Sequence, residues 1–278
     1  MKTKAYAKIN LTLDIIGKRS DGYHSLKSIM VPISLFDVVT VEKSDELIFD
    51  CDLPVLRENN HCVKAAKLYF ESSGIKGGAD IKLNKHIPFP AGLGGGSSDA
   101  AATLRLLNNI YNHAVSEEDL AYIALGVGSD VPFCLYGKPA LCEGRGEILT
   151  PLDNIGKFYI VVAIGSDRLP TAQVYDAYDN AGEKPTDFSD KMLAALKNGD
   201  KKAFYSSVGN AFEPVAEKLC PNVRKIKSLL LKYGAVSAIL SGSGPSVFGI
   251  FESEEKAIKA AVSLRGDGFF AVSGETFD

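Results

Sequence analysis

The sequence predicts an α+β protein with two domains. At 278 residues the chain is longer than one hydrophobic core usually organises, and it is short for three domains. Strand-like and helix-like patterns alternate along it without an internal repeat or a low-complexity tract. The segment 150–157, read TPLDNIGK, precedes an apolar strand pattern and predicts a boundary between domains 1–155 and 156–278. This order of elements favours helices packed on one face of mainly antiparallel sheets.

The first half opens with the clearest strand pattern in the chain. Over residues 5–16 apolar and polar residues alternate, so one face of the strand is apolar and the other is polar. A glycine-containing turn at 19–24 follows, and residues 29–41 are apolar and β-branched and predict a second strand. Helix patterns at 60–72, 99–111 and 118–126, with a strand around 81–83, complete this half.

The second half repeats the mixture of strands and helices. We expect strands at 158–164, 236–240 and 246–251, and helices around residue 175, at 191–197, at 223–233 and at 254–265. Two of these strands are separated only by the glycine-rich segment 241–245. That spacing is typical of a hairpin connection, and the motif taken alone favours this interpretation.

Composition excludes several classes of protein. Apolar residues make up 46% of the chain, charged residues 23%, and the net charge is −3, which indicates a globular protein without a nucleic-acid partner. No apolar stretch approaches the ~20 residues of a bilayer span, and no basic and apolar leader opens the chain. We therefore expect a cytoplasmic protein with no membrane partner.

The cysteines and histidines do not predict a metal site. Five cysteines contain no C-x-x-C pair, and the four histidines have no metal-ligand spacing to them. We expect reduced, mostly buried thiols and no structural zinc.

The segment 88–98, read PFPAGLGGGSS, concentrates the chemistry. Four glycines within five residues allow backbone N–H groups to turn toward one point, and Ser97 or Ser98 can cap the helix that follows. A phosphate suits such a loop at a helix N-terminus. The Lys of a P-loop is missing, and the fit to the loop of a dinucleotide fold is poor. The alternative is a tight turn with a capped helix.

Phosphoryl transfer to an alcohol needs a carboxylate near the hydroxyl and a cation for the developing charge. Asp130 and Lys8 are candidates for this pair. Lys8 and Asn10 lie two residues apart on the first strand, so their side chains point to the same face, roughly 6.6 Å apart. Asp130 can equally be a helix N-cap before Pro132, and Lys8 can be a solvated lysine on a strand face.

Six motifs in order give the chain a resemblance to the GHMP kinase superfamily. They read AKINLTL (7–13), KRSDGYHSL (18–26), IP with AGLGGGSSDAAA (87–88 and 91–102), GSDVPF (128–133), EGRGE (143–147) and LSGSGPS (240–246). The glycine motif is common to the superfamily. The first strand followed by RSDGYH resembles the branch whose alcohol substrate carries a cytidine diphosphate. The resemblance implies an N-terminal domain like ribosomal protein S5, a ferredoxin-like C-terminal domain, and a site between them.

The resemblance also implies roles for individual residues. Asp130 would be the catalytic base and Lys8 its charge-stabilising partner. ATP would be bound by the glycine run, with two residues near adenine: Pro88, Phe89, Pro90, Ala91, Gly92, Leu93, Gly94, Gly95, Gly96, Ser97 and Ser98, then Lys85 and Asn60. The alcohol substrate would be bound by Asn10, by Tyr23 and His24 at the cytosine, by Tyr175 as a second aromatic, and by the loop Gly242, Ser243 and Gly244.

The expected cofactor is ATP with Mg²⁺, the metal being held by phosphates and Ser98 without a dedicated carboxylate cage. The expected partner is a small molecule, an alcohol linked to cytidine diphosphate, and the chain would act as a monomer or homodimer. Two alternatives remain at this point. One is another superfamily kinase acting on a small alcohol such as homoserine or mevalonate, and the other is a non-catalytic nucleotide-binding relative.

Overall fold

The computed structural model describes residues 1–56, 58, 60–153, 155–182 and 185–277. The chain forms two compact units. Unit one comprises Met1–Lys8, Leu35–Pro88 and Gly94–Gly137, and unit two comprises Ile9–Ser34, Phe89–Leu93 and Lys138–Asp278. Each unit is assembled from separate stretches of chain, so a single boundary near residue 155 stays a prediction. Asn154, in the predicted linker, lies outside the described residues.

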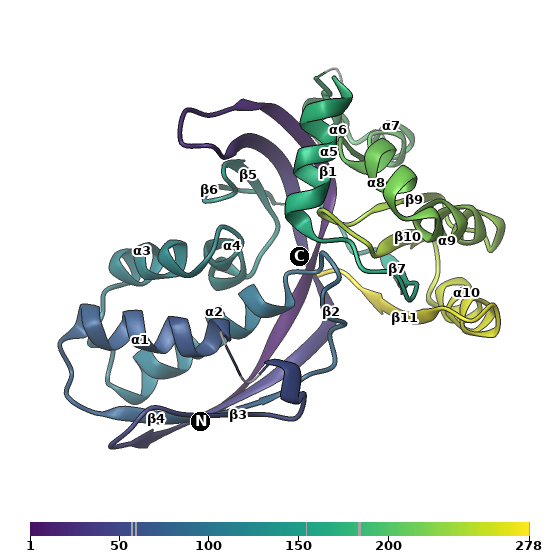
Figure 1. The fold of residues 1–278 in the computed structure, drawn as a ribbon. Coiled ribbons are helices and arrows are strands. Elements are labelled where there is room, and N and C mark those ends of the chain that lie inside the picture. The colour runs from purple at the N-terminus through teal and green to yellow at the C-terminus, as the bar shows by residue number, and fades with distance from the viewer. Residues whose placement is uncertain (57, 59, 154, 183–184, 278) are drawn as a thin grey trace. The chain divides into compact units, whose positions relative to one another are not determined.

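Unit one places helices against one side of its strands (Figure 1). Strand β4 (Gly78–Asn84) pairs antiparallel with the later part of β2 (His24–Ser44) and parallel with β3 (Ile48–Cys51). The helices are α1 (His61–Ser73), α2 (Gly95–Ile110), α3 (Glu117–Val127) and α4 (Val131–Tyr136), with a 3-10 turn at Pro54–Leu56. Helix α2 is buried around most of its circumference, because residues 98–104 and 106–108 are all buried.

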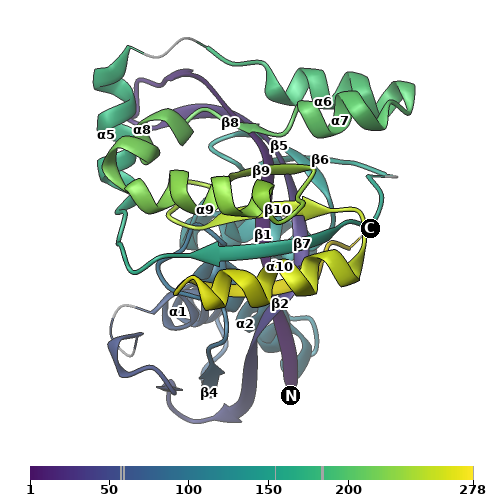
Figure 2. The same cartoon turned by 90° about the vertical axis from the view of Figure 1, so that its right-hand side faces the viewer.

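Unit two is built on a four-stranded antiparallel sheet of order β11-β7-β10-β9 (Figure 2). These strands are Phe270–Glu275, Tyr159–Ile164, Val247–Phe251 and Ser237–Leu240. Helices α9 (Pro221–Lys232) and α10 (Glu254–Gly266) cover one face, toward the viewer in Figure 2. The remaining elements are α5 (Thr171–Ala181), α6 (Phe188–Asn198), α7 (Lys201–Ser206), α8 (Glu213–Leu219), β5 (Ala140–Gly144), β6 (Ile148–Pro151) and β8 (Gly209–Asn210).

The first strand, β1 (Lys2–Lys18), is longer than predicted, and its alternation is confirmed. Its polar positions are buried as deeply as its apolar ones: Lys8, Asn10, Thr12 and Asp14 are all 3% exposed or less. A solvated Lys8 is therefore excluded. In unit two Thr12 and Asp14 bind Ser189 at the start of α6, so a helix covers this part of the polar face.

Most predicted elements are present, with ends shifted by a few residues. One expectation at a helix end is wrong. Helix α2 begins at Gly95, Gly94 stands at its N-cap position, and no side chain caps it. Ser97 and Ser98 lie inside the first turn, where Ser98 Oγ donates to Gly95 O at 3.0 Å. A glycine fits the N-cap because its backbone is left-handed there, with φ 66°.

The five cysteines are buried and free, as expected of reduced thiols. Within the part of the chain that the structure describes, no helix combines the length and apolar character needed to cross a bilayer.

Candidate active site

Lys8 and Asp130 meet in unit one. Lys8 Nζ lies 3.1 Å from Asp130 Oδ2, with the lysine side chain 4% exposed and the carboxylate 32% exposed. Asp130 occupies the N-cap position of α4 but makes no capping hydrogen bond. The predicted N-cap position of Asp130 before Pro132 is therefore confirmed, but its carboxylate pairs with an ammonium instead of capping the helix. The carboxylate is open to solvent and can receive a proton from a hydroxyl.

The backbone of the glycine run lies close to the Lys8 side chain at Gly94. A Cβ at position 94 would lie 2.9 Å from Lys8 Cγ and 3.1 Å from Cε. The backbone there is left-handed, which side chains other than glycine adopt only with strain. The glycine thus lets the backbone lie against the aliphatic part of the lysine, and the ammonium reaches Asp130 beyond it.

The start of α2 presents uncapped backbone N–H groups. The first intrahelical bond runs from Ser98 N to Gly94 O at 2.8 Å, so the N–H groups of the three residues before Ser98 precede the helical ladder. Their partial positive charge suits a phosphate. His61 lies beside this turn, because a Cβ at Gly96 would be 3.2 Å from its Nδ1.

Lys85 forms a buried ionic cluster with Asp37 and Asp99. Its ammonium contacts Asp37 Oδ2 and lies 2.7 Å from Asp99 Oδ2, and all three side chains are 3% exposed or less. Asp37 Oδ1 accepts from the backbone N–H of Ile87 at 2.8 Å, just before the glycine run. Lys85 Nζ would be 3.3 Å from a Cβ at Gly95. The cluster therefore supports the start of α2 from its buried side.

Burial raises the pKa of Asp99 to about 8, against the opposing effect of Lys85. Burial also acts to lower the pKa of Lys85, but Asp99 and Asp37 outweigh it and the pKa lies above its usual value. Two carboxylates thus share one ammonium.

The predicted role of Lys85 near adenine stays a prediction. Asn60, with the same predicted role, caps α1 by accepting from Cys62 N at 2.8 Å.

In unit two the two glycine motifs are in contact. The segment Phe89–Leu93 lies against the turn between β9 and β10, where Ser241 Oγ donates to Gly92 O at 3.1 Å and Ser246 N donates to Ala91 O at 3.3 Å. A Cβ at Gly92 would lie 2.3 Å from Ser241 O, so only glycine fits. The hairpin predicted from the second motif is confirmed, and its turn also supports the first motif.

The predicted substrate residues Asn10, on β1, and Gly242, Ser243 and Gly244, in the turn between β9 and β10, also lie in unit two. Asn10 Nδ2 donates to Ser28 Oγ at 2.7 Å, and its Oδ1 would be 3.5 Å from a Cβ at Gly242. Ser243 Oγ lies 2.9 Å from Thr171 Oγ1 at the start of α5. Gly244 is left-handed, with φ 85°. Among the residues of the first glycine motif, Phe89 is 58% exposed.

Tyr23, His24 and Tyr175 all lie in unit two, where the structure brings His24 and Tyr175 into contact. The rings of His24 and Tyr175 are 5.0 Å apart between centroids and tilted by 40°. His24 is buried, whereas Tyr23 is half exposed and has the guanidinium of Arg145 4.0 Å from its ring centroid. The structure thus brings the predicted second aromatic, Tyr175, to His24 itself.

Sequence reasoning missed several neighbours of these residues. Asp179 bonds His24, Arg145 covers Tyr23, and Asp37 holds Lys85. Asp179 had a usable signal, because it follows Tyr175 by four residues in a predicted helix and so shares its face. Asp37 had no such signal, because it is distant in sequence from its partners Lys85 and Ile87.

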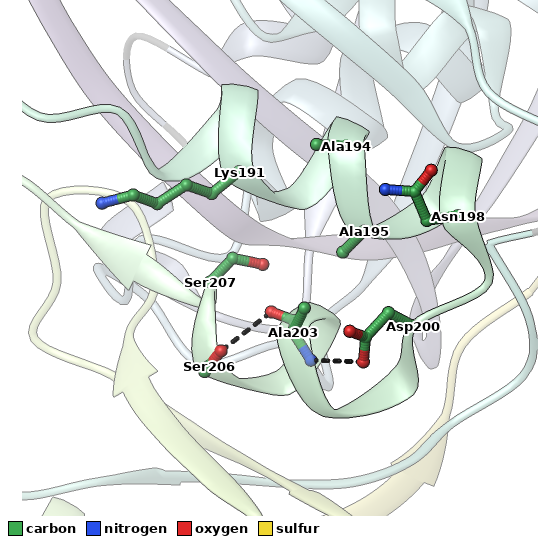
Figure 3. A pocket seen from close by; sticks show the side chains of 8 residues that line it. All are labelled: Lys191, Ala194, Ala195, Asn198, Asp200, Ala203, Ser206 and Ser207. Carbon is green, nitrogen blue, oxygen red and sulfur yellow. Dashed lines mark hydrogen bonds between the residues drawn. The ribbon is translucent and has the colours of Figure 1, made fainter.

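A pocket of about 270 Å³ lies between α6 and α7 and is shown in Figure 3. The residues that line it are Lys191, Ala194, Ala195, Asn198, Asp200, Ala203, Ser206 and Ser207. None of the predicted site residues is among them. Its lining combines alanines and serines with Lys191, Asn198 and Asp200.

Comparisons with known proteins identify the family. Residues 60–138 match the GHMP kinases N terminal domain, and residues 192–268 match the GHMP kinases C terminal domain. The 4-diphosphocytidyl-2-C-methyl-D-erythritol kinase of Caldicellulosiruptor saccharolyticus is 39% identical over 95% of this chain and 93% of its own length. The crystal structure of a 4-(cytidine 5'-diphospho)-2C-methyl-D-erythritol kinase matches 100% of both chains with a TM-score of 0.85 at 36% identity.

A homoserine kinase from Cytophaga hutchinsonii shares the fold, with a TM-score of 0.74 at 20% identity over 97% of this chain and 94% of that one. The two matched GHMP kinase domains and the relatives matched along nearly the whole chain indicate the same family. The chain belongs to the GHMP kinases and, among them, to the family of 4-diphosphocytidyl-2-C-methyl-D-erythritol kinases. The predicted α+β fold of the GHMP kind is confirmed.

Proposed function

We propose that this protein is an ATP-dependent kinase that phosphorylates the 2-hydroxyl of 4-diphosphocytidyl-2-C-methyl-D-erythritol. The reaction gives ADP and the 2-phosphate and belongs to the non-mevalonate route to isoprenoid precursors. The relatives matched over 95% of the chain support the substrate. The contact of Lys8 with Asp130, 3.1 Å between Nζ and Oδ2, is the observation that carries the reaction type.

Asp130 is the base of the proposed mechanism. As the substrate oxygen attacks the γ-phosphorus, its proton passes to the Asp130 carboxylate, and the bond from phosphorus to the ADP oxygen breaks in line. Lys8 stabilises the charge on the attacking oxygen and is held for this by its burial and by Gly94. No phosphoenzyme is required, because positioning and electrostatics can supply most of the acceleration.

The glycine run binds the ATP phosphates in this proposal. The N–H groups before Ser98 at the start of α2 provide donors and a helix dipole. Mg²⁺ accompanies ATP and, when bound, neutralises phosphate charge. Among the described residues no cluster of three His, Cys, Asp or Glu side chains could hold a metal. The phosphates and Ser98, whose oxygen keeps its lone pairs while it donates to Gly95 O, are therefore the proposed ligands.

The cytidine end is bound by Tyr23, His24 and Tyr175. The tilted contact of His24 with Tyr175 supports this, because it creates an aromatic surface with a polar ring nitrogen at its edge. A kinase for homoserine or mevalonate has no base to place there. The five free, buried cysteines are consistent with the reducing cytoplasm, which is the proposed location.

The test is an assay of ADP release with MgATP and a panel of three alcohols: the cytidyl substrate, homoserine and mevalonate. Release with the cytidyl compound alone is the expected result. Release only with another alcohol would make the chain a different GHMP kinase, and no release with any would favour a nucleotide-binding relative.

Asp130→Asn tests the assigned base in the same assay. Turnover should fall by roughly 10²-fold or more, because the amide cannot accept the proton. Binding of ATP, measured by calorimetry, should remain, because Asp130 pairs with Lys8 rather than with the glycine run. Near-normal turnover would remove Asp130 from the proposed mechanism.

A further inference from the structure

Helix α5 presents two side chains to His24. Tyr175 and Asp179 are four residues apart and therefore lie on the same face of the helix. The ring of Tyr175 packs against the imidazole at 5.0 Å between centroids, and Asp179 Oδ1 lies 2.7 Å from His24 Nε2. The imidazole is thus fixed by a ring contact and by a hydrogen bond from one helix.

The hydrogen bond settles which imidazole nitrogen carries a proton. A carboxylate only accepts, so Nε2 must donate to Asp179. The His24 side chain is 6% exposed, and that of Asp179 is 28% exposed. The hydrogen bonds from Lys18 and His24 hold the pKa of Asp179 below its usual value, Lys18 having the larger effect, so the carboxylate stays ionised.

Tyr175 is itself held in place. Its ring meets Phe212 edge-on at 4.6 Å between centroids. Phe212 is 1% exposed and belongs to the core of unit two. The imidazole therefore rests on a ring that the core fixes, and Asp179 determines how it is turned on that ring.

We propose that Asp179 is a positioning residue for base recognition: it orients His24 and fixes its protonated nitrogen so that the ring can meet the cytosine. The inference rests on the proposed function, since it assigns cytosine to this site. It concerns substrate binding, because the hydrogen bond of Asp179 is to the residue proposed to recognise the base. Asp179 therefore influences the affinity for the cytidyl substrate through His24.

The experiment compares Asp179→Ala, Asp179→Asn and the matched control Asp176→Asn. Asp176 is an exposed carboxylate on the same helix and also acts on Lys18, but it has no hydrogen bond to His24. Asp179→Ala should raise KM for the cytidyl substrate about tenfold, while kcat and KM for ATP change less than twofold. Asp179→Asn, which can still accept from Nε2, should recover part of the loss, and Asp176→Asn should behave as the unchanged protein.

A second readout does not depend on turnover. In ¹⁵N spectra of the histidine side chains, Nε2 of His24 should carry the proton in the unchanged protein, and Asp179→Ala should shift this signal toward a tautomer mixture. Circular dichroism of each variant verifies folding. If Asp179→Ala does not fold, Asp179→Asn replaces it, and the ¹⁵N signal of His24 is measured in that variant.

Three results would overturn the proposal. They are an unchanged KM for the cytidyl substrate in folded Asp179→Ala, an equal rise of KM in Asp176→Asn, and a His24 signal that Asp179→Ala does not move. These outcomes are separate from failure of the proposed function, which would appear as no turnover of the cytidyl substrate by the unchanged protein. The ring signal would still report on the contact of Asp179 with His24 in that case.

Discussion

At the scale of single residues, the proposed chemistry depends on how Lys8 is held. A lysine on a polar strand face usually extends into water, but here its side chain is 4% exposed and ends at Asp130. The backbone of Gly94 packs against the aliphatic part of the Lys8 side chain. This packing helps to determine where the ammonium lies. A substitution at this glycine therefore tests the geometry of the proposed catalytic pair, Lys8 and Asp130, without changing the charge of either residue.

Gly94→Ala is expected to lower kcat at least tenfold, because the new Cβ would lie 2.9 Å from Lys8 Cγ and displace the lysine from Asp130. Gly74→Ala is the matched control: its φ is also 66°, but nothing lies within 4 Å of its Cβ position. Both variants should lose about 1 kcal/mol of stability from the left-handed backbone. Steady-state kinetics and urea unfolding measure the two effects. Equal kcat in the two variants would contradict this account of Gly94.

At the scale of secondary-structure elements, one helix is capped by a strand that is distant in sequence. Asp187, at the N-cap position of α6, makes no side-chain cap. Asp14 of β1 takes over this role and accepts from Phe188 N at 2.9 Å and Ser189 N at 2.8 Å. It also accepts from Thr186 Oγ1 at 2.6 Å. The buried polar face of β1 therefore joins this helix to the part of β1 that belongs to unit two.

Asp14→Ala is expected to destabilise the protein by about 3 kcal/mol, because it leaves buried donors at the start of α6 without an acceptor. Asp200→Ala is the control, since Asp200 caps α7 locally by accepting from Ala203 N and is exposed. Its loss should be about 1 kcal/mol. Urea unfolding compares the two. A similar loss in both variants would mean that the bonds of Asp14 add little beyond an ordinary cap.

At the scale of the whole molecule, the cluster of Lys85, Asp37 and Asp99 makes folding sensitive to pH. Burial raises the pKa of Asp99 from 3.8 to about 8 in the folded protein. The folded state then keeps a proton that the unfolded chain releases, so stability falls as the pH rises. The contribution of Asp99 is complete below about pH 4, declines through the range between, and is lost once the pH passes about 8.

Asp99→Asn should remove this part of the pH dependence. Between pH 5 and pH 8 the free energy of unfolding of the unchanged protein should fall more than that of the variant, because an amide cannot release the proton. Urea unfolding at both pH values gives the comparison, and Asp119→Asn, a change of a carboxylate on α3 whose side chain lies at the surface, serves as control. Parallel stability curves for Asp99→Asn and the unchanged protein would show that Asp99 is ionised in the fold throughout this range.

The sequence predicted the elements well where periodicity was long. The alternation of β1, the helix patterns of α1, α3 and α9, and the hairpin around 241–245 are all present. Short elements such as β8 and α8 were missed, because two to seven residues carry too little periodicity to be distinguished from loop. The start of α2 was misplaced because glycines usually end helices, whereas here a left-handed Gly94 allows Gly95 to begin one.

The sequence by itself determined the family, because that depends on ordered motifs that are local in the chain, and it singled out Lys8, Asp130 and both glycine runs. Only the tertiary structure decided which groups hold them: Gly94 on Lys8, Ser241 on Gly92, and Asp179 on His24. These contacts join residues tens to more than a hundred positions apart. Periodicity and motif spacing describe neighbours along the chain, whereas hydrogen bonds and close packing depend on which segments the fold brings together.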